Sequence, residues 1–306
     1  MEQTPFFSVI IPTYNRAHII DFSVKSVLNQ TFKNFELIVI DDGSNDNTEE
    51  VIKNIKDKRL IYIKEKASGG PANPRNVGIK KAKADWICFL DSDDRWYQNK
   101  LEKVKKIIDE ENSDFIYHSM NVIGDQDREI LSKIPLIKMT PPAYKSYMLN
   151  FSTASIPTSS VTVRKSLLIK AGCFDISPDL VSIEDCDLWL KITLMTEKFY
   201  TLEEQLGEYR DSEDSLTTYE IKRCQNHNTL IMKHLDESRF NKKELKHIKT
   251  YLDYYLARSF HKNHHYEEAK RYYLKTVRAM TLNHIFIRGV TFLFMLIVKR
   301  MVTNSK

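Results

Sequence analysis

Short apolar runs alternate with segments of helical periodicity along the first 120 residues of this 306-residue chain. The apolar runs predict buried strands, at 8–11, 36–40, 60–63, 86–90 and 114–118. Apolar residues spaced three and four apart predict the helices between them, at 17–30, 45–55, 73–83 and 100–110. Strands and helices alternating at this spacing form βαβ units, so the predicted fold class is α/β, with a doubly wound, mostly parallel sheet flanked by helices.

After Asn150 the alternation weakens. A strand is predicted over 157–163. In the first half of the chain, Pro12 is expected to end the strand at 8–11. A short helix is predicted over 165–171, and a further helix over 188–194.

The last third of the chain has a largely helical pattern from residue 220 to residue 283. Residues 251–279 resemble one helical hairpin of a tetratricopeptide repeat. Because a single hairpin cannot form a solenoid, a plain helical pair is predicted. We therefore expect an α/β domain over 1–218 and a helical C-terminal region over 219–306.

Polar residues follow three of the predicted strands. In an open α/β sheet, ligands bind beyond the carboxyl ends of the strands. The three polar segments are Pro12-Thr13-Tyr14-Asn15-Arg16, Asp41-Asp42-Gly43-Ser44 and Asp91-Ser92-Asp93-Asp94. Their shared position at one edge of the sheet predicts a single binding site there.

The charge of +5 is unevenly distributed. Residues 220–306 carry 18 Lys and Arg against 7 Asp and Glu, a net +11, whereas residues 1–219 carry 28 against 34, a net −6. Such a basic region meets anionic lipid, nucleic acid or only solvent. The apolar segment 285–298 is too short to cross a bilayer of about 30 Å at 1.5 Å per residue. It predicts either an interfacial helix, with Lys299 and Arg300 as a basic flank, or a buried terminal helix.

The cysteines and the N-terminus indicate a cytoplasmic location. Cys88, Cys173, Cys186 and Cys224 show no CxxC spacing, which favours reduced thiols over a zinc site or disulfides. The segment Met1–Pro5 lacks the basic residues of a secretory signal. We expect a cytoplasmic protein, peripheral on the inner face of the membrane if the C-terminal segment is interfacial.

Three sets of charged residues are candidates for chemistry. The acidic turn Asp91–Asp94 offers oxygen ligands for Mg²⁺ or Mn²⁺, although acidic turns are also common on surfaces. Arg75 is predicted near a helix N-terminus after two glycines, where it can bind a phosphate or carboxylate. Asp42 is suited to a base edge or ribose, or to a solvent turn. Glu184-Asp185 precedes a helix and supplies either a general base or a helix cap.

Two long runs of the sequence are SVIIPTYNRAHIIDFSVKSVLNQTFKNFELIVIDDGSNDNT and GGPANPRNVGIKKAKADWICFLDSDDRW. Together they resemble the family 2 glycosyltransferases of the GT-A fold, of the bacterial cell-surface polysaccharide type. The similarity is close over residues 6–120 and looser to about 218. It implies a nucleotide-sugar donor, with a UDP-sugar as the first choice, and an acceptor that is a cell-surface glycan or is linked to a lipid.

The resemblance also implies roles for individual residues. It implies a nucleotide-sugar site formed by Pro12, Thr13, Tyr14, Asn15, Asp42, Arg75, Asp91 and Ser92. Asp93 would bind Mn²⁺ or Mg²⁺, and Asp185 would be the catalytic base of an inverting transfer. Glu184 and Trp189 would belong to the sugar or acceptor pocket. The QxxRW pattern of processive enzymes is absent, which favours addition of a single sugar.

One departure from the family concerns the metal site. Many relatives have Tyr-Arg-x-His after the base, whereas this chain has Tyr209-Arg210-Asp211-Ser212. Ser212 in place of His implies a weaker metal site, or ligation by Asp211 or water.

Three other functions are alternatives. A catalytically silent nucleotide-sugar-binding or scaffold protein would fit the missing histidine. A nucleotidyltransferase would need a Gly-rich, basic loop where Pro12-Thr13-Tyr14-Asn15 stands. Nucleic-acid binding by the basic region is not expected, and would show as retention on DNA that falls steeply with salt.

Overall fold

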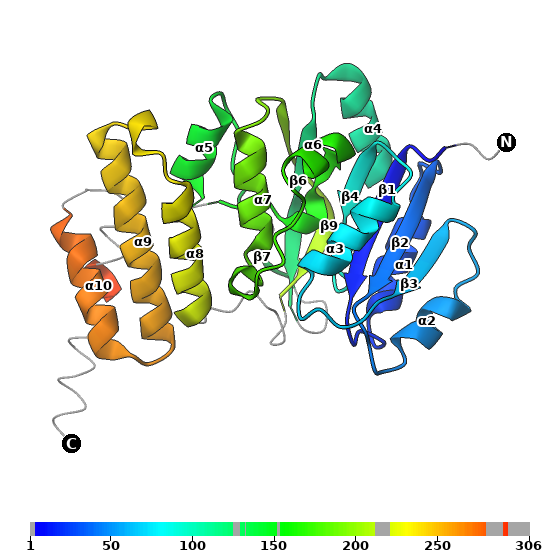
Figure 1. Cartoon of the computed structure of the whole chain (residues 1–306), viewed down its shortest axis with the longest axis horizontal. Helices are drawn as coiled ribbons and strands as arrows, with labels where there is room; N and C mark the ends of the chain where they lie inside the picture. The colour runs from blue at the N-terminus through cyan, green and yellow to red at the C-terminus, as the bar shows by residue number, and fades with distance from the viewer. Residues whose placement is uncertain are drawn as a thin grey trace. The chain divides into compact units, whose positions relative to one another are not determined.

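The structure, a computed structural model, describes residues 4–124, 129–131, 133–151, 154–211, 221–279 and 290–292 (Figure 1). The chain divides into two compact units, residues 1–215 and 216–306. Each unit is described by itself below.

The first unit is built on a sheet whose N-terminal half is parallel. Its strand order begins β3 (Leu60–Lys64), β2 (Phe35–Asp41), β1 (Phe7–Thr13), β4 (Trp86–Phe89), all in one direction. This half confirms the predicted doubly wound, parallel arrangement. It is the half that ends in the three polar segments.

The second half of the sheet is mixed. It continues through β8 (Thr162–Arg164), β6 (Phe115–Ile123), β9 (Phe199–Arg210) and β5 (Arg95–Trp96), with β7 (Glu129–Leu131) paired to β6. Of these strands, β6 and β9 pair in parallel, and the other contacts are antiparallel.

Helices cover both faces of the sheet, which explains why its central strands are apolar throughout. Alternate residues of β1, namely Phe7, Val9 and Ile11, share one core cluster with apolar residues of three helices. Those helices are α1 (Ile20–Leu28), α2 (Thr48–Asn54) and α4 (Lys100–Glu110).

The opposite face is covered by α3 (Ala72–Lys81) and α7 (Glu184–Thr193) (Figure 1). A Cβ atom placed on Gly78 of α3 would lie only 2.5 Å from Cγ2 of Ile10 in β1. Glycine at this position therefore lets the helix backbone lie directly on the strand. Smaller elements complete the unit, namely α5 (Ala143–Asn150), η2 (Thr158–Ser160), α6 (Lys165–Lys170) and η3 (Pro178–Leu180).

Several element boundaries differ from the sequence prediction. The first strand does not end at Pro12 but continues to Thr13. Pro12 lies two residues beyond Ile10, the last residue of β1 that pairs with β4. Proline, which has no N–H to donate, is therefore tolerated where the pairing with β4 has already ended. The strand predicted over 157–163 is the turn η2 followed by the short strand β8. The helix predicted over 188–194 begins earlier, at Glu184.

The second unit contains three long helices among the described residues. They are α8 (Ile221–His234), α9 (Lys242–Lys262) and α10 (Tyr266–Arg278), with the short turn η4 (Glu237–Arg239) between α8 and α9. Asn241 and Glu244 form a reciprocal capping box at the start of α9. The predicted pair over 251–279 corresponds to the second half of α9 with α10, joined by a core of Tyr254, Ala257, Phe260, Ala269 and Tyr273.

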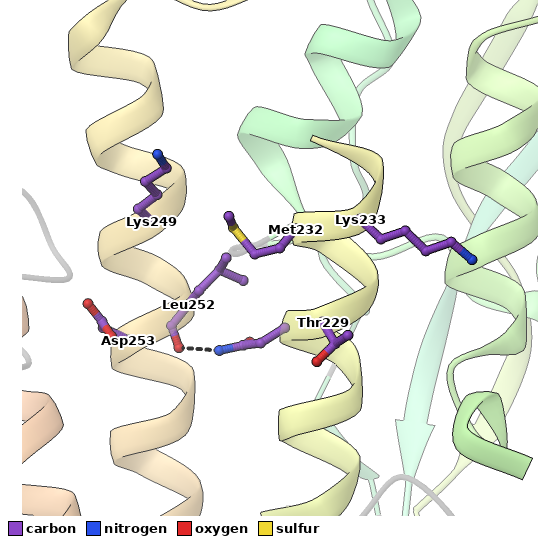
Figure 2. Close-up of a pocket in the computed structure, with 7 residues that line it drawn as sticks. Thr229, Met232, Lys233, Lys249, Leu252 and Asp253 are labelled. Carbon is purple, nitrogen blue, oxygen red and sulfur yellow. Dashed lines mark hydrogen bonds between the residues drawn. The ribbon is translucent and has the colours of Figure 1, made fainter. Parts of the chain in front are cut away.

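A surface groove of about 660 Å³ lies between α8 and α9 (Figure 2). It is lined by Asn228, Thr229, Met232, Lys233, Lys249, Leu252 and Asp253. The Asn228 amide donates to the backbone carbonyl of Leu252 at 2.8 Å and ties the two helices together. None of the sequence-predicted site residues lines this groove.

Most of the apolar segment 285–298 lies outside the described residues, which include only the helical residues 290–292 of it. Within the described part of the chain, no helix has the length and apolar character needed to cross a membrane.

Candidate functional site

The acidic turn after β4 presents two of its residues and buries the other two. The side chains of Asp91 and Asp93 are 31% and 26% exposed, whereas Ser92 and Asp94 are buried. From α1, the buried Ser23 hydroxyl lies 2.8 Å from the Ser92 carbonyl and 2.6 Å from that of Asp94. The buried pair thus anchors the turn while the other two carboxylates face accessible space.

Asp94 links this turn to two other parts of the unit. Its Oδ1 accepts from the backbone N–H of Arg210 at the end of β9, at 2.9 Å, and its Oδ2 accepts from the Ser159 hydroxyl. The same Ser159 oxygen accepts from the Asp91 N–H at 3.0 Å. Burial, followed by the carboxylates of Asp93 and Asp91, raises the pKa of Asp94 well above its usual range. Asp94 is therefore an anchor within the protein.

Arg75 joins the acidic turn to the second predicted carboxylate pair. Its Nη2 donates to Asp91 Oδ1 at 2.7 Å and its Nη1 donates to Glu184 Oε1 at 2.6 Å. The guanidinium is 4% exposed and lies over the Phe174 ring. Burial alone would lower the pKa of Arg75, but the carboxylates of Asp91 and Glu184 raise it above its usual range, so the cation is retained. Burial raises the pKa of Glu184, and the guanidinium opposes that rise.

The close approach of α3 to β1 places this arginine. Arg75 lies in the same helix as Gly78, one turn earlier. Because Gly78 has no side chain, α3 packs onto Ile10 and its first turn reaches the carboxyl edge of the sheet.

Asp185 lies in the first turn of α7, next to Glu184. Its Oδ2 accepts from the Thr158 hydroxyl at 2.7 Å, and its Oδ1 accepts from the Cys186 N–H at 2.8 Å. Asp185 is partly exposed, whereas Glu184 is 3% exposed. Within the pair, Glu184 is thus held by Arg75, and Asp185 is the carboxylate with access to a bound molecule.

The loops after β1 and β2 are tied together beside this turn. The Asp42 N–H donates to the Thr13 carbonyl at 2.8 Å, and the Asn15 N–H donates to the Ser44 hydroxyl at 2.8 Å. Asn15 has a φ of 53°, in the left-handed region that asparagine tolerates better than most residues. This turn brings the Arg16 guanidinium to 4.0 Å from Asp93 Oδ2 and joins the loop to the acidic turn.

The side chains of these loops differ in their environment. Tyr14 is 50% exposed, which leaves its ring free to stack. The buried Thr13 hydroxyl has no hydrogen-bond partner among the described residues. Asp42 Oδ1 accepts from both the N–H and the hydroxyl of Ser68, at 2.9 and 2.7 Å. Pro12 is buried near the end of β1, just before this loop.

The residues at the acidic turn fit a divalent cation that is bound together with a diphosphate. In the described part of the chain, no group of three or more His, Cys, Asp or Glu side chains is placed to hold a metal ion. Mg²⁺ sites in enzymes that use phosphorylated substrates often need only one or two carboxylates, because substrate phosphates complete the coordination. Asp93 supplies one such carboxylate, and Asp91 lies in the same turn but is held by Arg75. Burial and the Asp91 carboxylate raise the pKa of Asp93, with Arg16 opposing the rise.

The prediction that Trp189 lines a sugar or acceptor pocket is wrong. Trp189 is 1% exposed, and its ring packs against Phe89, Phe115 and Phe174, with centroids 4.9 to 6.3 Å away. It lies on the face of α7 that covers the sheet, so it supports the helix that carries Asp185.

Of the remaining sequence-predicted residues, Pro12 and Thr13 end β1, and Tyr14, Asn15, Asp42, Asp91, Ser92 and Asp93 follow β1, β2 and β4 at one edge of the sheet, whereas Arg75, Glu184 and Asp185 belong to α3 and α7. Ser212 lies outside the described residues, and Asp211 is exposed at the end of β9. Sequence reasoning missed Ser23, Thr158 and Ser159. Their hydroxyl groups find partners 27 to 71 residues away, and nothing local in the sequence marks such contacts.

Comparison with known proteins agrees with this geometry. The profile of glycosyl transferase family 2 matches residues 8–171, more than half of the chain, and the chain belongs to this family. The crystal structure of residues 1–349 of S. aureus TarS in complex with UDP-GlcNAc has a TM-score of 0.63 and 23% identity, covering 90% of this chain and 81% of that one. The fold is the GT-A fold that the sequence resemblance implied.

Two relatives illustrate the extent of the sequence similarity. A glycosyltransferase of Rickettsia bellii is 39% identical over 188 residues, which are 61% of this chain and 26% of that protein. The Escherichia coli enzyme WfgD, a UDP-Glc:α-D-GlcNAc-diphosphoundecaprenol β-1,3-glucosyltransferase, is 34% identical over 185 residues, which are 60% of this chain and 68% of that protein. This chain thus spans about a quarter of the length of the first relative.

Proposed function

We propose that this chain transfers a single sugar from a UDP-sugar to a hydroxyl group of a lipid-linked or polymer-bound cell-surface glycan. The observation that carries the proposal is the Arg75 bridge, which joins Asp91 and Glu184 through contacts of 2.7 and 2.6 Å. It holds the acidic turn, suited to a diphosphate, near Asp185, a partly exposed carboxylate suited to a base. Membership of glycosyl transferase family 2 supports the same reaction.

Donor binding is assigned to the loops after β1, β2 and β4. We assign the exposed Tyr14 ring and the Asp42 carboxylate to the base, and the Thr13 hydroxyl, which has no hydrogen-bond partner among the described residues, to a polar group of the nucleotide. Asp91 is assigned to the ribose and Asp93 to the diphosphate with its cation. A bound Mn²⁺ or Mg²⁺ would neutralise charge on the diphosphate and stabilise it as a leaving group.

Transfer is assigned to Asp185. Its carboxylate takes the proton from the acceptor hydroxyl as that oxygen bonds to the anomeric carbon, and the bond from that carbon to the diphosphate breaks. Attack from the face opposite the diphosphate inverts the anomeric configuration. Glu184 stays paired with Arg75 and fixes the start of α7.

The E. coli relative, whose name gives α-D-GlcNAc-diphosphoundecaprenol as its acceptor, supports the proposed acceptor class. A lipid carrier would place the reaction at the membrane surface. The helices of the second unit suit that location, because residues 220–306 carry a net charge of +11.

A transfer assay tests the proposal. Wild-type protein is incubated with Mn²⁺, UDP-glucose or UDP-GlcNAc, and an alkyl-diphosphate-linked GlcNAc acceptor, and the products are weighed by mass spectrometry. We expect Asp185→Asn to bind UDP like the wild type but to lose transfer, by about 10²-fold or more for loss of a general base. Asp179→Asn, an exposed carboxylate shortly before α7, is the matched control and should remain active.

Two results would contradict these assignments. If the wild type binds UDP but transfers no sugar with any of the tested donors and acceptors, the catalytically silent scaffold function is favoured. Wild-type rates in Asp185→Asn would remove Asp185 as the base.

A further inference from the structure

Three consecutive hydroxyl residues form the short turn η2, between α5 and β8. Thr158, Ser159 and Ser160 are 6%, 1% and 0% exposed, so each hydroxyl needs a protein partner. The three partners are different. Thr158 donates to Asp185, Ser159 contacts the acidic turn, and Ser160 donates to the Pro157 carbonyl of its own turn at 2.7 Å.

The Ser159 hydroxyl acts on both ends of the acidic turn. It donates to the Asp94 carboxylate and accepts from the Asp91 N–H at 3.0 Å. The Ser159 hydroxyl oxygen therefore holds both the first residue of the turn, Asp91, and its last, Asp94. Between these contacts lies Asp93, the residue assigned to the diphosphate and its cation.

The Thr158 hydroxyl acts on the candidate base. It holds Asp185 Oδ2 at 2.7 Å, while the other oxygen accepts only from the neighbouring Cys186 N–H among the hydrogen bonds of the described residues. Thr158 thus fixes the orientation of the Asp185 carboxyl group relative to α7.

The turn that carries both hydroxyls is itself held firmly. Its backbone closes through Ser160 N–H to Pro157 and Val161 N–H to Thr158, at 2.9 and 3.0 Å. The Trp96 indole N–H donates to the Ser159 carbonyl at 2.7 Å, and the buried Lys100 ammonium lies 3.8 Å from the centre of the Trp96 ring. A rigid support of this kind transmits the position of one partner to the other.

We propose that Thr158 and Ser159 are positioning residues that fix the distance and orientation between the base carboxylate and the donor-binding turn. Within one buried turn, Thr158 holds the candidate base, and the adjacent Ser159 holds the acidic turn assigned to the donor. This inference rests on the proposed function, because it gives Asp185 and Asp93 the roles assigned above.

Four variants separate the two contacts. Thr158→Val keeps the shape but removes the hydroxyl, and Thr158→Ser keeps the hydroxyl. Ser159→Ala removes the contact with the acidic turn. Ser160→Ala is the matched control, since it removes an equally buried hydroxyl from the same turn without touching either half.

We expect each contact to affect a different kinetic constant. Thr158→Val should lower kcat about 10-fold or more and leave the Kd for UDP with Mn²⁺ unchanged, because a displaced base slows proton removal. Thr158→Ser should recover most of kcat. Ser159→Ala should weaken UDP binding in Mn²⁺ roughly 10- to 100-fold, the usual effect of losing a group that orients a metal ligand. Ser160→Ala should change neither constant.

The outcomes distinguish the inference from the proposed function. If the wild type neither binds UDP nor transfers sugar, the proposed function fails and the inference with it. If the wild type is active but Thr158→Val and Ser159→Ala match Ser160→Ala, only the positioning role is refuted. A Thr158→Ser variant as slow as Thr158→Val would refute it too. Should Ser159→Ala fail to fold by thermal melting, Ser159→Cys, whose thiol is a weaker donor of similar size, replaces it in the same comparison.

Discussion

Replacing Arg75 by Met removes the cation that is shared by Asp91 and Glu184. Glu184 would then be a carboxylate with 3% exposure and no charged partner, and its Oε2 already has no hydrogen-bond partner among the described residues. Removing one partner of a buried ion pair costs about 3–5 kcal/mol, because the other charge stays buried. A protein of this size has a free energy of unfolding of about 5–15 kcal/mol, so the variant should fold but be clearly weakened.

The loss of stability in Arg75→Met should depend on pH. Burial already raises the pKa of Glu184 above its usual 4.5, and removing the guanidinium removes the largest effect that opposes that rise. The folded variant then holds a proton that the unfolded chain releases above about pH 4.5. Its stability is therefore greatest at low pH and falls as pH rises from the unfolded pKa through the folded pKa. We expect the deficit relative to the wild type to be larger at pH 8 than at pH 5.

Urea unfolding at pH 5 and pH 8 measures both effects. Arg164→Met is the control, because Arg164 pairs with Asp114 at 2.7 Å but its side chain is 43% exposed. Such a pair contributes about 0–1 kcal/mol. An Arg75→Met variant within about 1 kcal/mol of the wild type at pH 8 would show that the bridge does not compensate a buried charge. An equal deficit at both pH values would exclude Glu184 as the group responsible.

Two further predictions concern the donor and the membrane. Asp93→Ala should lose most of the Mn²⁺-dependent gain in UDP affinity by calorimetry, while Asp109→Ala, an exposed carboxylate of α4, should keep it; an unchanged gain in Asp93→Ala would refute the metal role. Removal of residues 285–306 should reduce sedimentation with anionic vesicles while the transfer of sugar to a water-soluble acceptor continues; full-length protein that never sediments with these vesicles would refute the interfacial prediction for 285–298.

The N-terminal half of the sheet could be predicted from the sequence, because its strands are continuous apolar runs. Strand β9 could not, since its central residues include Glu203, Glu204 and Glu208, which interrupt any apolar pattern. Its place in the sheet comes from pairing with β6, a contact between segments about 84 residues apart. Predicting it would need knowledge of the partner strand.

The candidate site was predictable to the extent that its residues follow strand ends. Asp42, Asp91 and Asp93 stand there, and the sheet topology alone brings them to one edge. Trp189 was misplaced, because proximity to Asp185 in sequence says nothing about which face of α7 a side chain occupies. Thr158 and Ser159 gave no signal, since a hydroxyl residue in a loop has the same local pattern whether it faces solvent or a carboxylate.

The ion pairs of Arg75 with Asp91 and Glu184 depend on the short distance between α3 and β1, which Gly78 permits. With a Cβ only 2.5 Å from Ile10, any larger residue would push the helix away from the strand, and the guanidinium one turn earlier would move with it. Arg75 and Gly78 should therefore be inherited together. A homologous chain that keeps the arginine but carries a bulkier residue three positions later should also show a smaller side chain opposite, where this protein has Ile10.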